Sequence, residues 1–216
     1  MSKVQKSLLE STPAREASQE MIDEQTADAI TQKKLEALCA KHLHIKRLAW
    51  LRRWNRAVDF AAIGVPGFYF VFRYLAKGRE AGPYVETSWE ILAASLVLLV
   101  LAKIVFHWEE RAKRHSQLLG ENIALVRQAD NLLATRRTDL SEGVQLFFAL
   151  VEKTDLADNE AFGIPAEKDS QFAYRQGLKE LKGVCQHCKS SPWDYKPGSC
   201  QVCGNTPADQ RQKKEA

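Results

Sequence analysis

The chain has 216 residues, of which 45% are hydrophobic. Its mean hydropathy is below zero, which excludes a transporter with many membrane spans. Its 31 basic and 27 acidic residues give a formal net charge of +4, too small by itself to indicate a nucleic-acid-binding protein. The polar N-terminal sequence MSKVQKSLLESTPAREASQE lacks the apolar core of a secretory signal, so a later apolar segment would have to direct any membrane insertion.

Residues 1–12 predict a flexible N-terminus, and residues 13–56 predict a cytoplasmic helix. The pair Thr12-Pro13 matches an N-cap followed by a first-turn proline, and Glu16 supplies an early acid. Helix formers dominate the rest of this segment, although the sequence HLHIK leaves a break open.

Three side chains in this helix are of types that can bind metal or react. His42 and His44 are two residues apart and face different sides of a helix, so we expect them at the surface rather than around a metal ion. We expect Cys39 to be a small buried apolar residue rather than a reactive thiol.

Two apolar segments, Ala57–Leu75 and Ser88–Trp108, are joined by the polar turn AKGREAGPYVET. They contain 19 and 21 residues, and at 1.5 Å per residue each would reach roughly 30 Å, the thickness of the hydrocarbon layer. Residues 57–108 therefore predict a two-transmembrane helical hairpin. A soluble antiparallel helix pair is the alternative.

Aromatic and basic residues predict the topology of this hairpin. Tryptophan and tyrosine are enriched at membrane interfaces, and here they flank the segments: Trp54, Tyr74, Trp89 and Trp108. Basic residues gather on the two long flanks: Lys46, Arg47, Arg52, Arg53 and Arg56 before the hairpin, and Arg111, Lys113 and Arg114 after it. By the positive-inside rule, both termini are expected in the cytoplasm.

Three residues of the second segment are candidates for lining a pore: Glu90, Ser95 and Lys103. Two of them have alternative roles. Thr87 and Glu90 match a capping box that would begin the helix, and Lys103 could extend its ammonium group to the cytoplasmic interface. Only Ser95 is polar between the two charges, so other lining side chains would be mainly apolar.

Residues 109–154 predict a second cytoplasmic helix, because apolar residues recur there at helical spacing. They form two groups: Leu119, Ile123, Val126 and Leu133, then Leu140, Val144, Phe147, Phe148 and Val151. Their faces need a partner, and the helix before the hairpin, in the same or another subunit, is the candidate. Residues 155–182 predict a linker and a short helix, and residues 207–216 a tail. The fold expected is an all-α membrane protein.

Two CxxC pairs separated by eleven residues form the clearest motif, within residues 183–206. The four cysteines are Cys185, Cys188, Cys200 and Cys203. Each CxxC makes a tight knuckle, and four thiolates form a tetrahedral shell that suits zinc. We therefore expect a small zinc ribbon with one structural Zn²⁺, iron being the alternative metal. A closed shell leaves no position for a catalytic water, and Trp193 and Tyr195 are expected to pack the module.

The sequence contains no GxxxxGK(S/T), GxGxxG, HExxH or GxSxG motif, and we expect no enzyme. Two apolar segments with a short turn, flanking helices and a terminal CxxC-x11-CxxC together resemble the bacterial mobile-element proteins named for that cysteine spacing. Those proteins are in turn similar to the SLATT group of two-transmembrane effectors of antiphage systems. The resemblance implies a homo-oligomeric pore in the bacterial inner membrane, gated by a nucleotide or oligonucleotide signal from a partner nucleotidyltransferase.

The phosphates of such a signal would need cationic side chains on the cytoplasmic side. The candidates are Arg111, Lys113, Arg114, Arg127, Arg136 and Arg137. Contact with lipid headgroups is the alternative for the first three, and a solvated helix surface for the last two. At the level of function, the alternatives are a membrane-anchored zinc-ribbon module that binds a partner protein or nucleic acid without a pore, and a soluble helical regulator.

Overall fold

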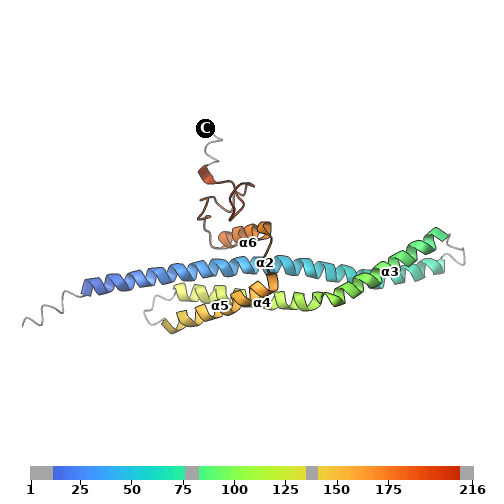
Figure 1. The fold of residues 1–216 in the computed structure, drawn as a ribbon, viewed down its shortest axis with the longest axis horizontal. Helices are drawn as coiled ribbons and strands as arrows, with labels where there is room; N and C mark the ends of the chain where they lie inside the picture. Colours follow the sequence, from blue (N-terminus) through green and yellow to red (C-terminus); the bar gives the residue numbers. More distant parts are fainter. Residues whose placement is uncertain (1–11, 76–82, 135–140, 210–216) are drawn as a thin grey trace, which may run out of the picture. The chain divides into compact units, whose positions relative to one another are not determined.

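A computed structural model describes residues 12–75, 83–134 and 141–209; the side chains of residues 12–23, 73, 83–85 and 141 are not included. These residues form five α-helices and no β-strand: α2 (Thr12–Leu75), α3 (Pro83–Val105), α4 (Trp108–Ala134), α5 (Ser141–Phe162) and α6 (Glu167–Glu180) (Figure 1). An isolated antiparallel bridge joins Pro197 and Asn205. Over the described residues the fold is all-α, as predicted.

The chain divides into two compact units. One contains Met1–Leu43 and Gly120–Ala216, and the other contains His44–Leu119. Both α2 and α4 contribute residues to each unit.

The first unit has a core formed by three helices. Its buried side chains are Ile30 and Ala37 of α2, Leu125 and Ala129 of α4, and Phe147 and Val151 of α5. The amide nitrogen Nδ2 of Asn122 donates to Asp158 Oδ2 at 3.0 Å, and both side chains are buried, so this bond ties α4 to α5. The segment predicted as a second helix, now α4 and α5, thus packs on α2 within the same chain.

Buried positions on α2 recur every seven residues: Ile30, Ala37, His44, Leu51 and Val58. A seven-residue repeat keeps one helix face toward a partner, as in coiled coils. Because His44 occupies one of these positions, the expectation of a surface histidine is wrong there. His44 is 0% exposed, and its Nδ1 lies 3.0 Å from Nδ1 of His115 within the second unit. The helix shows no break at HLHIK.

Three predicted helix bounds differ from the structure. α3 begins at Pro83, a favoured first-turn residue, so Thr87 and Glu90 lie inside the helix and do not form its N-terminal capping box. α4 begins at Trp108, after a turn in which His107 has φ 50°. α5 continues to Phe162, beyond the predicted end at residue 154, because helix formers continue there and Asp158 bonds to Asn122.

In the second unit, α3 packs antiparallel to the C-terminal part of α2. At one end the ring centroids of Tyr69 and Trp89 are 5.0 Å apart. At the other end Lys103 Nζ lies 2.6 Å from Asp59 Oδ1 and 2.8 Å from Glu109 Oε1. Among the described residues, one segment is long and apolar enough to cross a membrane, Glu86–Val105 of α3, and 6% of it is buried.

Candidate functional site

The four cysteines predicted to bind metal are brought together. Their Sγ atoms all lie within 4.8 Å of one another, and all four residues are buried. Tetrahedral zinc with Zn–S bonds of about 2.3 Å places its sulfurs about 3.8 Å apart, so four converging thiols fit this metal. Four thiolates also suit iron.

The two CxxC segments have the same backbone hydrogen bonds. In the first, Lys189 N donates to Cys185 O at 2.8 Å and Cys185 N donates to Ser190 O at 3.1 Å. In the second, Gly204 N donates to Cys200 O at 2.7 Å, and Cys200 N donates to Asn205 O at 3.2 Å. These repeated bonds turn each pair of thiols toward one point.

Both turns require a left-handed residue directly after the second cysteine. Lys189 has φ 57° and Gly204 has φ 68°. At Gly204 a Cβ would also meet the side-chain ends of Gln171 and Arg175 of α6, so a larger residue would push these side chains aside in addition to straining the backbone.

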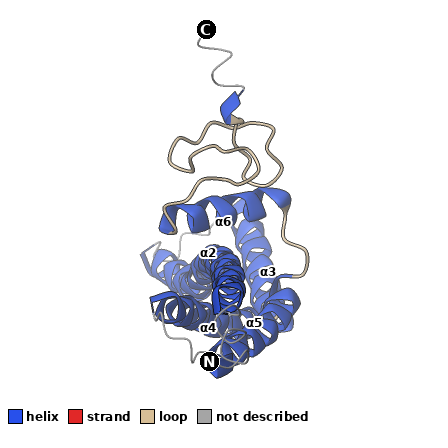
Figure 2. Cartoon of the chain, turned by 90° about the vertical axis from the view of Figure 1, so that its left-hand side faces the viewer, coloured by secondary structure: helices blue, strands red, loops and turns tan. Residues whose placement is uncertain are grey.

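Helix α6 supports the cysteine module from one side (Figure 2). Gln171 Nε2 donates to Gln201 O at 3.2 Å, and the guanidinium of Arg175 donates to Cys203 O. Tyr174 packs on the buried cysteines. Burial raises the pKa of Tyr174 to about 12, so its phenol stays protonated and shares a hydrogen bond with Cys185.

Asn205 organises the loop between the knuckles and is 1% exposed. Its Oδ1 accepts from Lys196 N and Thr206 N, both at 2.9 Å, and its Nδ2 donates to Ser191 O at 3.1 Å. The chain remains hydrogen-bonded to the module as far as Ala208, whose N–H donates to Cys188 O at 3.2 Å. The module thus includes residues from the start of the predicted tail.

The thiols differ in acidity. Burial raises the pKa of Cys185 and Cys203. Burial also opposes ionisation of Cys188, yet hydrogen bonds from Ser190 and neighbouring thiols outweigh it and lower the pKa of Cys188 to about 7. A metal ion bound by all four sulfurs must therefore displace protons, and its binding is expected to strengthen as pH rises. Outside the cluster, burial raises the pKa of Cys39 to about 12, which makes it an unreactive thiol.

The three candidate pore residues are not gathered in one place. Their spacings of five and eight residues put them on different faces of α3. Ser95 Oγ donates to Ile91 O at 2.8 Å, within the helix, and Lys103 is engaged by Asp59 and Glu109. Glu90 is exposed beside an apolar groove.

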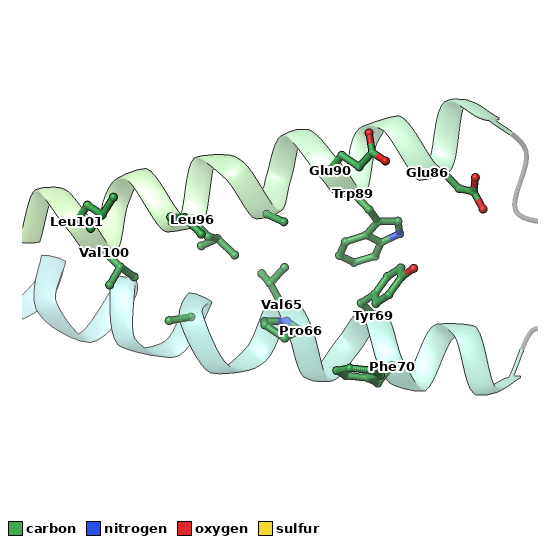
Figure 3. A pocket seen from close by; sticks show the side chains of 13 residues that line it. Val65, Pro66, Tyr69, Phe70, Glu86, Trp89, Glu90, Leu96, Val100 and Leu101 are labelled. Carbon is green, nitrogen blue, oxygen red and sulfur yellow. The ribbon is translucent and has the colours of Figure 1, made fainter.

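That groove, of about 620 Å³, lies between α2 and α3 of the second unit (Figure 3). Its walls are apolar and aromatic, and include Val65, Pro66, Tyr69, Trp89, Leu96 and Val100. Glu86 and Glu90 lie at the same end as Tyr69 and Trp89 (Figure 3). The sequence did not predict this groove, because it depends on how the two helices pack.

The candidate signal-binding residues lie mainly on α4. Arg111, Lys113 and Arg114 are exposed on its first two turns in the second unit, and Arg127 is exposed in the first unit. Arg136 and Arg137 lie outside the described residues.

Trp193 and Tyr195 were expected to pack the cysteine module, and this expectation is wrong. Trp193 is 64% exposed and Tyr195 is 43% exposed. The module instead fills its interior with the four cysteines, Leu178 and the side chain of Asn205. Two aromatic rings therefore remain at the surface.

Comparison with known proteins identifies one family. The sequence model of a family described as "Mobilome CxxCx(11)CxxC protein" matches residues 27–206, which include the four cysteines, the whole second unit and most of the first. No curated protein matches the chain, and no solved structure matches it.

Proposed function

The chain belongs to the mobilome CxxCx(11)CxxC protein family, and from this premise we propose that it is one subunit of an oligomeric membrane pore. The pore would be a SLATT-type effector of a bacterial antiphage system, gated by a nucleotide or oligonucleotide signal from a partner nucleotidyltransferase. It would reside in the inner membrane, with both termini in the cytoplasm. The cysteine module, loaded with zinc, would be a structural part of the cytoplasmic region.

The observation that carries this proposal is the exposure of α3. Its 20-residue apolar segment has only 6% of its residues buried, and large side chains such as Ile91, Leu98 and Ile104 are more than half exposed. A core helix of a soluble protein would bury this surface, because each exposed apolar side chain forgoes roughly 1.5–3 kcal/mol. A bilayer or neighbouring subunits would cover it.

The contacts within the hairpin suit a membrane. Asp59 and Lys103, the charges nearest the inner end of the two helices, are paired with each other at 2.6 Å, as charges near apolar segments usually are. Trp89 and Tyr69 meet at the opposite end, where amphipathic rings suit an interface. Two helices cannot enclose an ion path alone, so a pore requires several copies.

Purified protein tests the proposal directly. The full chain is expected to stay with membranes after carbonate extraction, to have a protein mass in detergent of several times 24.4 kDa, and to release dye from liposomes when the signal is present. If α3 lines the path, Glu90→Gln changes the ion selectivity of the conductance. Glu142→Gln, an exposed carboxylate on α5 in the other unit, serves as the matched control.

A second candidate function is favoured by the exposed rings of Trp193 and Tyr195. In that case the hairpin is only an anchor, and the cysteine module binds a partner protein or nucleic acid. A monomer in detergent that gives no dye release under any nucleotide would reject the pore and leave the anchored module.

A further inference from the structure

Two aromatic rings project from the loop between the CxxC knuckles. Trp193 is 64% exposed and Tyr195 is 43% exposed, and they are two residues apart in the sequence. The loop that carries them is held from inside, because the buried side chain of Asn205 bonds to the backbone of Ser191 and Lys196. The rings are therefore presented by an ordered support.

Each ring has a cation from α6 beside it. The Arg175 guanidinium lies 3.9 Å from the centroid of the Tyr195 ring, and Lys179 Nζ lies 5.4 Å from that of Trp193. Arg175 and Lys179 are four residues apart and so share one face of α6. The four residues form one surface, called here the aromatic–basic surface: Arg175, Lys179, Trp193 and Tyr195.

The segment that carries this surface has an excess of basic residues. Between Arg175 and Lys196 the chain has five basic and two acidic residues. One of the two acids, Glu180, is already engaged by Lys41 and His42 of α2. The other, Asp194, lies between the two aromatic residues in the sequence, and it has interactions of its own. The segment thus has three more basic than acidic residues, which favours a polyanion as the ligand.

We propose that the aromatic–basic surface binds single-stranded nucleic acid, with bases stacked on Trp193 and Tyr195 and phosphates beside Lys179. Alternating aromatic rings and cations are what single strands require, since every base has a stacking face and every nucleotide adds one negative charge. An acidic protein segment would use the cations but gain little from the exposed faces of the two rings. Duplexes hide their bases, so the surface selects unpaired strands.

The inference rests on the second candidate function, in which the cysteine module binds a partner, and it requires neither membrane insertion nor a pore. Binding is measured on the full chain in detergent, and conductance is measured in liposomes. Strand binding by a protein that is monomeric in detergent and releases no dye under any nucleotide would reject the pore and keep this inference, and dye release without strand binding would do the reverse.

The test uses a fluorescently labelled single-stranded RNA of about 12 nucleotides. Trp193→Ala and Tyr195→Ala are each expected to weaken binding roughly tenfold, while Trp193→Phe keeps most of the affinity. Lys179→Gln is expected to reduce the slope of log affinity against log salt by about 0.7. Lys153→Gln, an exposed lysine on α5 and so on another helix, is the matched control and should leave the slope unchanged.

Metal content is measured for every variant, and it should stay at the wild-type level because both rings lie outside the cysteine cluster. RNA affinity that is unchanged in the Trp193→Ala, Tyr195→Ala double variant would overturn the inference. So would equal affinity for a duplex of the same sequence. Tighter binding of a labelled polyglutamate peptide, lost in Lys179→Gln but kept in Trp193→Ala, would identify an acidic protein as the partner instead.

Discussion

Lys189 and Gly204 occupy the same position in the two CxxC turns but tolerate it differently. Both have positive φ, a conformation that disfavours a side chain by roughly 1–2 kcal/mol. Lys189 bears this strain with its side chain in solvent, whereas any Cβ at position 204 would also collide with Gln171 of α6. The same backbone turn is thus open on one side of the metal site and covered on the other.

Gly204→Ala is expected to destabilise the module by about 2 kcal/mol, since it adds both backbone strain and a collision. Lys189→Gly relieves strain but adds chain entropy to the unfolded state, so its net effect should stay within about 0.5 kcal/mol. Competition with a chelator for the bound metal measures both variants. Equal loss of metal affinity in the two variants would contradict the role given to α6.

At the scale of elements, α6 connects the cysteine module to α2. A Cβ at Gly177 would lie 3.0 Å from Leu35 Cδ1 and 3.3 Å from Cys39 Sγ, so the two helices pack closely there. At the end of α6, Glu180 accepts from Lys41 Nζ at 2.5 Å and from His42 Nε2 at 2.7 Å. The small residue and the carboxylate fix where α6 meets α2.

This contact should weaken in acid. Burial acts to raise the pKa of Glu180, but hydrogen bonds from Lys41 and His42 outweigh it and lower that pKa. The stabilisation by the Glu180 carboxylate is therefore present above the ordinary glutamate pKa and is lost as pH falls through the lower folded value. Burial lowers the pKa of His42, so protonation below about pH 6.5 also favours release. The side chain of Glu180 is 40% exposed, which limits the pair to about 0.5–1 kcal/mol.

Hydrogen exchange of α6 amides measures this effect. Protection factors, which correct for the intrinsic pH dependence of exchange, should fall between about pH 5 and about pH 3.5 more in the wild type than in Glu180→Gln, which lacks the titrating carboxylate. Loss of metal at low pH affects both chains and cancels in this comparison. Glu152→Gln, an exposed carboxylate on α5, should behave as the wild type.

The sequence predicted what local spacing encodes. CxxC spacing defines a chelate, so all four thiols come together as expected. The support from α6 was missed because Arg175 reaches Cys203 across 28 residues of sequence, a contact that no local pattern reveals. His44 was misplaced because it is a polar residue at a core position of the seven-residue repeat, and the end of α5 was misplaced because a charged stretch was taken for a loop.

At the scale of the whole molecule, the first unit contains two cores with no buried residue in common. One joins α2, α4 and α5, and the other consists of Leu178 and the four cysteines, with Leu35 and Tyr174 packed against it. The cysteine core is too small to persist on apolar burial alone, so its fold should depend on the bound metal. The helical core has no such dependence, and the two should unfold separately.

Removing the metal with a chelator is therefore expected to unfold the cysteine module while α2, α4 and α5 remain helical. The helical circular dichroism signal should fall by no more than the contribution of the 14 residues of α6. Trypsin should cut at Lys189 and Lys196 before it cuts at Lys34, which pairs with Asp130 at 2.5 Å. Cys185→Ser should reproduce the effect, whereas Cys39→Ser, outside the cluster, should retain the metal. A single cooperative loss of helix together with the metal would show instead that the cysteine module holds the helical core together.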